Sequence, residues 1–260
     1  MGVKIHSYIR YSFMKISVIT VSFNNADTID DTIRSVIGQD YADVEYIIVD
    51  GASSDDTLKI AEQYKLKISK IVSSKDDGIY FALNHGISLA TGDVIAFLHA
   101  DDLYATNHVL SDVMKIFSEK KVDSVYGDLH YVDRTDTSKV LRNWKSGEYK
   151  DGLFLEGWMP PHPAFFLRKD CYDRFGKFNT SFVSAADYEL MLRMLHKNKI
   201  SSFYLPNVLV KMRTGGTSNV SLKNRIRANR EDRRAWKING LNPGMLTLIR
   251  KPLSKLKQFF

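Results

Sequence analysis

The alternation of strand and helix patterns over the first 110 residues limits the fold of this chain more than any other feature. Four short runs rich in β-branched and other apolar residues indicate strands, and helical patterns separate them. The runs cover residues 15–23, 44–53, 67–74 and 93–102. Nearly continuous apolar runs are typical of strands that are covered on both faces. The alternation therefore predicts an α/β fold with a mostly parallel central sheet flanked by helices.

Helices are expected between these strands. The first follows Asp27, which has the position of an N-cap, and ends at Gly38. The next two cover residues 53–64 and 78–92. Their apolar residues recur at helical spacing, so each helix can bury one side on the sheet.

The second half of the chain is less regular. Residues 122–133 and 138–144 indicate two strands joined by a polar turn, and a Pro-rich loop precedes a short strand and a helix. Residues 181–199 predict a strong helix, while 201–218 indicate a strand pair, or a strand and a loop. The expected organisation is an N-terminal extension (1–13), one catalytic domain (14–220) and a basic amphipathic C-terminal tail (221–260).

Charge and cysteine content indicate the cellular compartment expected for the protein. The net charge of +7 comes from the tail: after residue 221 there are eleven Lys and Arg against two acidic residues. The one cysteine, Cys171, cannot form an intrachain disulfide, which favours a reducing, cytoplasmic setting. No apolar run approaches the length of a membrane-spanning helix, and residues 1–13 lack the apolar core of a signal peptide.

Polar residues follow the strands at their carboxyl ends, where open α/β sheets bind ligands. They are Asn24, Asp50, the stretch 73–77, and the adjacent pair Asp101 and Asp102. Because the carboxyl ends of parallel strands meet at one edge of a sheet, we expect these four segments to converge there. The convergence of separate segments is the first indication of a functional site.

Two adjacent carboxylates after a buried strand suit Mg²⁺ or Mn²⁺, which prefer oxygen ligands. Asp101 and Asp102 are too few for a protein-only cage, so water and substrate phosphates would complete the coordination. The alternative is that Asp102 caps a following helix. The other acidic residues expected at the same edge favour the metal–diphosphate interpretation.

Other candidates have equally plain structural alternatives. Asp50 can bind a ribose hydroxyl or a base N–H, or it can form an Asp-Gly turn. Asp187 can accept a proton from a sugar hydroxyl, or it can complete a capping box with Ser184. Trp158 can stack on a sugar, and His162 lies in the same Pro-stiffened loop. Neither G-x-G-x-x-G nor G-x-x-x-x-G-K-[ST] occurs, so no glycine loop cradles phosphates.

The ordered set of motifs resembles the family 2 glycosyltransferases, which are inverting enzymes with a GT-A, Rossmann-like fold. The likeness covers residues 14–220 and is greatest to bacterial enzymes that build surface polysaccharides, colanic-acid glycosyltransferases among them. It rests on "ISVITVSFNNADTIDDTIRSV", "IIVDGASSDDT", "KDDGIYFALNHGISLATGDVIAFLHADD", "PHPAFFLRKD", "SAADYELMLR" and "MRTGGTS".

The resemblance implies roles for particular residues. It implies that Asp187 is the catalytic base, that Asp101 and Asp102 match the metal-binding D-x-D region, and that His162 lies near a sugar. His99 stands where many members carry Asp or Asn, which leaves the metal ligand open between the two acids. The resemblance implies nucleotide or donor contacts for Thr20, Ser22, Asn24, Asp50, Asp76, Asp101 and Arg213, the last with the "GGTS" loop closing over the diphosphate.

The expected activity is therefore transfer of a sugar from a UDP-, GDP- or dTDP-sugar to a hydroxyl of a lipid-linked saccharide, with Mn²⁺ or Mg²⁺ as cofactor. A nucleotidyltransferase of similar fold and an inactive membrane-associated binding module are the alternatives. The basic tail can lie on an anionic membrane, which implies a peripheral place on the inner face of the cell membrane. It can instead be a helix packed on the catalytic domain. No nucleic-acid motif accompanies the charge.

Overall fold

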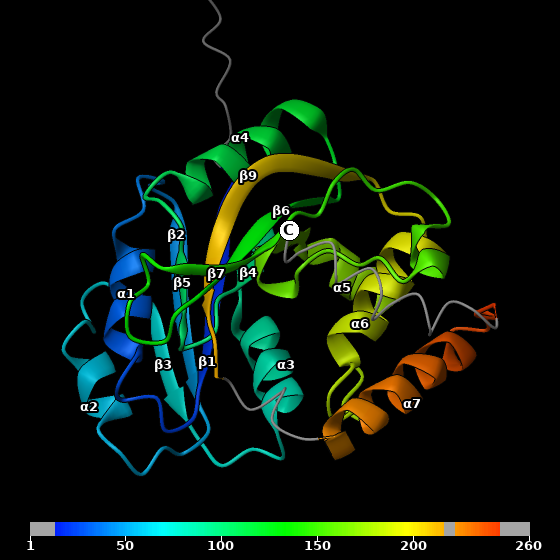
Figure 1. The fold of residues 1–260 in the computed structure, drawn as a ribbon. Coiled ribbons are helices and arrows are strands. Elements are labelled where there is room, and N and C mark those ends of the chain that lie inside the picture. The colour runs from blue at the N-terminus through cyan, green and yellow to red at the C-terminus, as the bar shows by residue number, and fades with distance from the viewer. Residues whose placement is uncertain (1–13, 216–221, 245–260) are drawn as a thin grey trace, which may run out of the picture.

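The central element of the structure is a nine-stranded sheet with the strand order β3-β2-β1-β4-β8-β6-β9-β5 and with β7 beside β6 (Figure 1). The computed structural model describes residues 14–215 and 222–244. The predictions for residues 1–13, for most of the "GGTS" loop and for the end of the tail lie outside these residues. The strands are β1 (Ile16–Ser22), β2 (Val44–Asp50), β3 (Lys70–Ser73), β4 (Val94–Phe97), β5 (Asp102–Tyr104), β6 (Ser124–Val132), β7 (Val140–Trp144), β8 (Phe165–Arg168) and β9 (Ser202–Arg213).

The predicted α/β architecture is confirmed. Strands β3, β2, β1 and β4 are parallel neighbours, and β9 runs parallel to β6. The antiparallel pairs involve β5, β7 and β8, all in or beside the second half of the sheet. Every residue of β1 is buried, as its continuous apolar pattern predicted. Of the two alternatives for residues 201–218, the strand followed by a loop fits the described residues, since β9 ends at Arg213 and a turn follows at 214–215.

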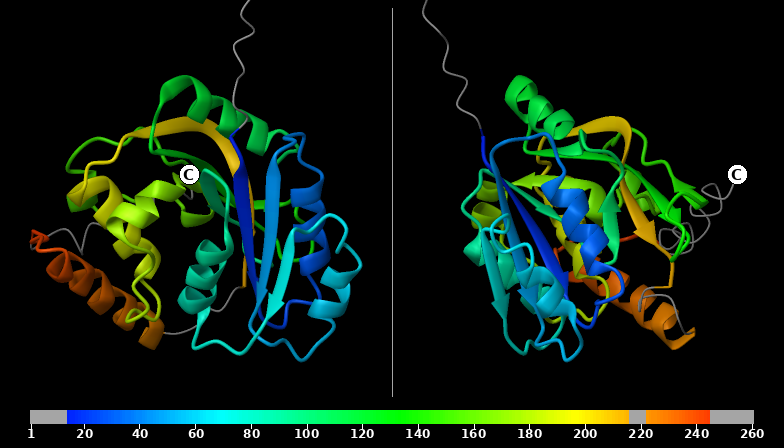
Figure 2. Two further views of the ribbon diagram at one scale, coloured as in Figure 1. Left: turned by 180° about the vertical axis from the view of Figure 1, so that it is seen from behind. Right: turned by 90° about the vertical axis from the view of Figure 1, so that its left-hand side faces the viewer.

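Helices cover both faces of the sheet, and Figure 2 shows the two layers from behind and from the side. One hydrophobic core joins the sheet to α1, α2 and α4, and a second joins it to α3, α5, α6 and α7. The helices are α1 (Ile29–Ile37), α2 (Thr57–Glu62), α3 (Ile79–Leu89), α4 (Val109–Lys120), α5 (Lys169–Phe175), α6 (Ala186–Met191), which continues as a π-helical turn (Leu192–Lys197), and α7 (Leu222–Ile238).

The packing of α3 on β1 depends on Gly86. A Cβ atom at this position would lie 2.5 Å from Cγ2 of Ile19, which is fully buried. We expect Gly86→Ala to lower the free energy of unfolding by roughly 1–3 kcal/mol, because the added methyl group overpacks the core. Ser88→Ala, on an exposed position of the same helix, is the control and should change stability by less than about 0.5 kcal/mol in denaturant titrations. Equal stabilities of the two variants would contradict this account.

Three local predictions about helix ends are wrong. Asp27 does not cap α1, because Thr28 precedes the helix and the carboxylate of Asp27 pairs with Arg134 at 2.6 Å. Ser184 and Asp187 form no capping box, because Ala185 has the cap position and no side chain caps α6. The helix-cap alternative for Asp102 also fails, because this residue begins strand β5.

The basic tail begins with helix α7, which packs on the catalytic domain. Ala235 and Trp236 are buried in the same core as α6, and the indole Nε1 of Trp236 donates to the hydroxyl of Tyr188 at 2.9 Å. Residues 222–244 of the tail therefore pack on the domain, as the alternative of a packed helix predicts. Within residues 14–215 and 222–244, no helix has the length and apolar character needed to cross a membrane.

Candidate active site

The carboxyl edge of the parallel strands brings Ser22, Asp50 and Ser73 side by side, since β1, β2 and β3 pair in that register. Asp50 is fully buried, and its carboxylate accepts bonds from the hydroxyls of both serines at 3.1 and 2.8 Å. It also accepts the N–H of Ser53 at 2.8 Å and the hydroxyl of that residue. Asp50 thus ties three strand ends together, and in this structure it presents no carboxylate oxygen to a ligand.

The loops after β1 and β2 are held against each other. The backbone N–H of Asn24 donates to the hydroxyl of Ser53 at 2.9 Å, and the side-chain oxygen of Asn24 accepts the backbone N–H of Ser54 at 2.9 Å. Asn24 and Ala52 both have positive φ angles, 53° and 61°. A left-handed alanine is costly, so this loop pair is held in a defined shape by its contacts. Asn24 is exposed at the edge of the sheet.

Thr20 and Ser22 lie deeper than the sequence indicated. Thr20 is fully buried, and its hydroxyl lies 3.1 Å from that of Tyr46. Ser22 is buried against Asp50. The structure therefore places Thr20 in the interior of the sheet and Ser22 beneath the exposed edge.

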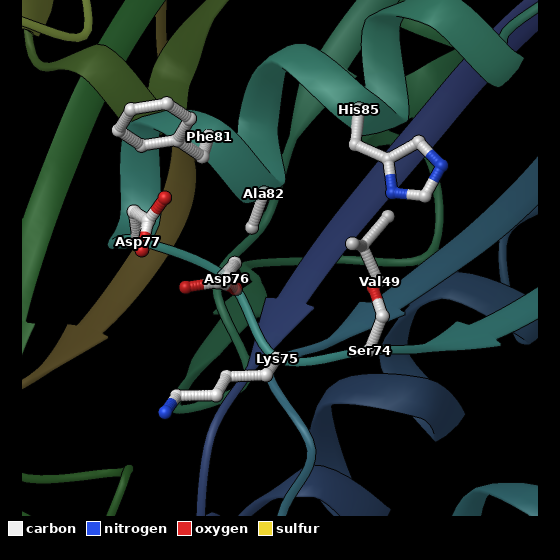
Figure 3. Close-up of a pocket in the computed structure, with 8 residues that line it drawn as sticks. All are labelled: Val49, Ser74, Lys75, Asp76, Asp77, Phe81, Ala82 and His85. Atoms are coloured by element: carbon white, nitrogen blue, oxygen red, sulfur yellow. The ribbon is translucent and has the colours of Figure 1, made fainter.

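A cavity of about 240 Å³ lies at the carboxyl end of β3, between the following loop and α3 (Figure 3). Asp76 is part of its wall and accepts the N–H of Gly78 at 2.9 Å. A Cβ atom on Gly51 would lie 3.1 Å from Oδ2 of Asp76 and 3.4 Å from the ring of Phe23, so the glycine keeps this space open. The lining residues are Val49, Ser74, Lys75, Asp76, Asp77, Phe81, Ala82 and His85.

Phe23 is a feature of this edge that the sequence interpretation missed. It directly follows β1, and 62% of its surface is exposed, although a phenylalanine normally buries its ring. The ring lies close to Gly51, on the same side as Asp76. A large aromatic residue at the end of a buried strand, followed by two asparagines, was the available signal.

The two adjacent acids have different environments. Asp101 is partly exposed, whereas Asp102 is 1% exposed and neither of its carboxylate oxygens has a hydrogen-bond partner within residues 14–215 and 222–244. Burial, and then the charge of Asp101, raise the pKa of Asp102 well above its usual value. Of the pair, only Asp101 therefore presents its side chain to the edge of the sheet.

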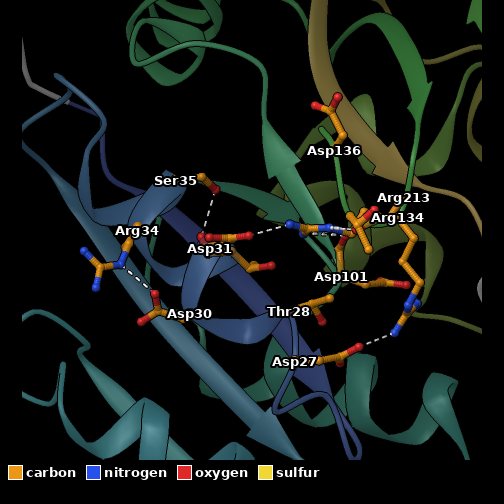
Figure 4. Close-up of polar contacts among 12 residues, drawn as sticks. Asp27, Thr28, Asp30, Asp31, Arg34, Ser35, Asp101, Arg134, Asp136 and Arg213 are labelled. Carbon is orange, nitrogen blue, oxygen red and sulfur yellow. Dashed lines mark hydrogen bonds and ion pairs between the residues drawn. The ribbon is translucent and has the colours of Figure 1, made fainter. Parts of the chain in front are cut away.

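The backbone of the pair is held by side chains from both halves of the chain. The hydroxyl of Thr32 donates to the carbonyl of Asp102 at 2.7 Å. Nη1 of Arg213 donates to the carbonyl of Asp101 at 3.2 Å (Figure 4). Arg213 is 5% exposed; it also donates to the carbonyl of Arg134 at 3.0 Å and pairs with Asp31. The guanidinium is thus bound within the protein, with its Nη1 at the backbone of Asp101.

Two histidines lie beneath the acidic edge. The rings of His99 and His162 are 6.0 Å apart, and His162 also contacts Phe97 and Phe178. Burial, and then the charge of His99, lower the pKa of His162 to about 3, so this ring is neutral. Its Nε2 and the Nδ1 of His99 are buried without a hydrogen-bond partner in the described part of the chain. Both rings can therefore bond to a polar group that enters the site.

Asp187, in the first turn of α6, faces the same region. Its carboxylate accepts a bond of 3.4 Å from the hydroxyl of Tyr80, in the first turn of α3. Burial lowers the pKa of His99, while the charges of Asp101 and Asp187 oppose that shift. Charges from two distant segments of the chain thus act on one imidazole.

Trp158 and Arg193 have structural partners. The indole of Trp158 donates to the carbonyl of Ser146 at 2.7 Å, and its ring stacks on Tyr149 with centroids 5.2 Å apart. Arg193 forms an ion pair of 2.8 Å with Glu189 and bonds to carbonyls of the loop after α5. Neither side chain reaches toward Asp101 through any of these contacts.

The donor set fits a divalent cation that is shared with a substrate. Within the described residues, no three His, Cys, Asp or Glu side chains form a closed metal cage. Asp101 supplies an accessible carboxylate, and the next residue, Asp102, has a buried carboxylate without a hydrogen-bond partner among the described residues. Mg²⁺ and Mn²⁺ are hard ions that commonly bind one or two carboxylates together with phosphate and water.

The fold, with its acidic carboxyl edge, is that of the GT-A glycosyltransferases. The chain belongs to the glycosyl transferase family 2, whose family model matches residues 17–176. This membership confirms the resemblance inferred from the motifs and decides against the nucleotidyltransferase alternative. The protein is accordingly a transferase that acts on sugars.

Relatives and solved structures agree with this assignment. An uncharacterised glycosyltransferase of Mycobacterium tuberculosis is 33% identical over 183 residues, 68% of each chain. The PGL/p-HBAD biosynthesis glycosyltransferase of Mycobacterium bovis is 29% identical over 208 residues, 78% of each chain. Residues 1–349 of Staphylococcus aureus TarS, solved with UDP-GlcNAc, share the fold with a TM-score of 0.67 at 18% identity, over 91% of this chain and 69% of that one. The mannosyltransferase PcManGT of Pyrobaculum calidifontis, solved with GDP-Man and Mn²⁺, gives 0.64 at 20% identity, over 92% and 69%.

Proposed function

We propose that this protein is an inverting glycosyltransferase that uses a nucleotide-diphosphate sugar and a divalent cation. The observation that carries the proposal is the accessible carboxylate of Asp101 at the carboxyl edge of the sheet in a chain of the glycosyl transferase family 2. One carboxylate at the strand edge suits a cation and a diphosphate, and a separate one at a helix start suits a proton acceptor. The solved structures that hold UDP-GlcNAc, or GDP-Man with Mn²⁺, support this choice of donor class.

The nucleoside would lie across the ends of β1 and β2. The exposed ring of Phe23 offers a face on which a base can stack, and Asn24 borders the same edge. Asp76 faces this space across Gly51 and would contact the nucleotide. Asp50 would shape the floor through its serine bonds, in place of the direct base contact that the resemblance implies.

Asp101 would be the principal protein ligand of Mn²⁺ or Mg²⁺, and the buried Asp102 follows it in the sequence. Such an ion neutralises the charge that develops on a departing diphosphate. Arg213 and Thr32 would contribute by fixing the backbone carbonyls of the two acids. His99 and His162 each keep a nitrogen ready to bond a sugar hydroxyl.

Asp187 would accept the proton of the acceptor hydroxyl as its oxygen attacks the anomeric carbon. The bond from the anomeric carbon to the diphosphate breaks as the new glycosidic bond forms, so one displacement inverts that carbon. The hydroxyl of Tyr80 bonds to the Asp187 carboxylate and would hold one of its oxygens.

The acceptor that we propose is a lipid-linked saccharide in the biosynthesis of a bacterial surface polysaccharide. A mycobacterial relative is named a PGL/p-HBAD biosynthesis glycosyltransferase, which supports a role in biosynthesis. Exposed basic residues of α7 would contact an anionic membrane. These residues are Arg230, Arg233 and Lys237.

The membrane proposal predicts a loss of binding when these residues are neutralised. Replacing Arg230, Arg233 and Lys237 by glutamine removes three charges that face solvent and leaves the buried side of α7 intact. Since each surface charge contributes about 1 kcal/mol, partitioning to anionic vesicles should fall on the order of a hundredfold at low salt. Liposome flotation measures this, and equal flotation of the wild type and the triple variant would exclude membrane contact through α7.

The donor class is tested by thermal stabilisation with a panel of UDP-, GDP- and dTDP-sugars. A donor that binds only the folded state at a hundred times its dissociation constant stabilises by about 2.7 kcal/mol. We expect one nucleotide to raise the melting temperature with Mn²⁺ present and to lose this effect with EDTA. A panel without any stabilising member would count against the proposed function.

A further inference from the structure

Helix α7 contacts the segment that leads into α6, the helix that carries Asp187. The contact centres on Glu231, a carboxylate that is only 9% exposed although it belongs to a strongly basic helix. Its Oε1 accepts the N–H of Val183 at 3.0 Å. Its Oε2 accepts the N–H of Ser184 at 2.8 Å and the hydroxyl of that residue at 3.0 Å. One side chain of α7 therefore satisfies three donors immediately before α6.

This arrangement replaces a local helix cap. No side chain of the 181–187 segment caps α6, and Ser184, the expected cap, turns toward Glu231. Ser and Thr hydroxyls at such positions ordinarily accept from the helix backbone, which fixes the entry of the chain. Here the entry is fixed by a carboxylate that lies more than forty residues further along the chain.

Two further contacts hold the residues of α6 that follow Asp187 in the sequence. Trp236 donates to the hydroxyl of Tyr188, and the amide of Asn239 donates to Oε1 of Glu189 at 2.9 Å. The residues directly after Asp187 are thus also bonded to α7. Glu231 thus binds the chain just before Asp187, and Trp236 and Asn239 bind it just after. The first turn of α6 is held on both sides by α7 and the residue that follows it.

We propose that Glu231 is a positioning residue for Asp187, and that α7 completes the active site by fixing the turn from which the base projects. The inference rests on the proposed function, because it assumes that Asp187 is the base. Tyr80 supports the geometry: after burial, the charges of Asp187 and then Glu231 raise the pKa of its hydroxyl, so both carboxylates lie near it. A catalytic group displaced by about 1 Å can lose on the order of a hundredfold in rate.

The test compares Glu231→Ala and Glu231→Gln with Asn229→Ala, a change at an exposed position two residues earlier on α7. Release of nucleoside diphosphate is measured with Mn²⁺ and the best-stabilising nucleotide sugar of the panel. We expect Glu231→Ala to lower kcat by about 10- to 100-fold while the KM for the donor changes by less than about twofold. The glutamine variant keeps one carbonyl acceptor, so it should regain part of kcat, and Asn229→Ala should match the wild type.

Circular dichroism and the melting temperature show whether each variant is folded. If the alanine variant does not fold, the glutamine variant decides, with a reduced kcat at unchanged donor KM as the expected result. A wild-type kcat per folded molecule in Glu231→Gln and Glu231→Ala would overturn the inference, and so would equal losses in kcat and donor affinity. If Asp187→Asn is inactive and Glu231→Ala is fully active, only this inference is overturned. If Asp187→Asn is itself fully active, the proposed function is overturned as well.

Discussion

Replacement of Asp187 by asparagine is expected to lower the rate of sugar transfer by about 10³-fold, because a general base typically contributes 10²–10⁴. Asparagine has nearly the shape of aspartate but cannot accept the proton of the acceptor hydroxyl at neutral pH. The change keeps a side-chain oxygen for the bond from Tyr80, so the packing of α3 against α6 should persist. The loss should therefore appear in kcat, while the dissociation constant of the donor stays nearly unchanged.

Asp173→Asn is a matched control for this prediction. It makes the same change of carboxylate to amide on an exposed side chain of α5, which pairs only at 3.5 Å with Lys169 among the described ion pairs. Its kcat should equal that of the wild type. Single-turnover transfer measured beside donor titration separates the two quantities, and a fully active Asp187→Asn would rule out the assignment of the base.

The second large effect is expected at the acidic pair, where the two members should differ. Asp101→Asn removes the accessible carboxylate and should lower kcat/KM by about 10²–10³-fold, the usual loss when one preorganised charge is removed. It should also weaken Mn²⁺-dependent donor binding. Asp102→Asn changes a side chain that is 1% exposed, keeps its volume and should retain most of the Mn²⁺-dependent binding.

Calorimetric titration of the donor with and without Mn²⁺ compares the two variants directly. In Asp101→Asn, addition of Mn²⁺ should no longer tighten donor binding. The reverse order, with Asp102→Asn losing the metal effect and Asp101→Asn keeping it, would show that the ligand assignment within the pair is inverted.

The first half of the fold could be predicted because its pattern is local. The apolar run of β1 and the register of parallel strands follow from hydrophobic periodicity and from the right-handed crossover, which place Ser22, Asp50 and Ser73 on one edge. The family motifs added the expected roles of the acids. The local pattern did not indicate the direction in which each polar side chain points at that edge.

The errors come from contacts between distant segments. Asp27 and Ser184 have the composition of helix caps, yet Arg134 and Glu231 bind them instead. The sequence does not reveal that Arg213 pairs with Asp31, because these two residues lie near opposite ends of the chain. The basic tail suggested a separate element, since the burial of Trp236 against α6 cannot be recognised from charge alone.

The central claim is that a divalent cation, held at Asp101, and the carboxylate of Asp187 act together on a nucleotide sugar in one site. Release of nucleoside diphosphate from the stabilising nucleotide sugar, measured with Mn²⁺ and again with excess EDTA, tests this claim most directly. The account predicts release with Mn²⁺ that EDTA abolishes and fresh Mn²⁺ restores. Release that continues unchanged in EDTA, or no release from any sugar nucleotide of the panel, would contradict it.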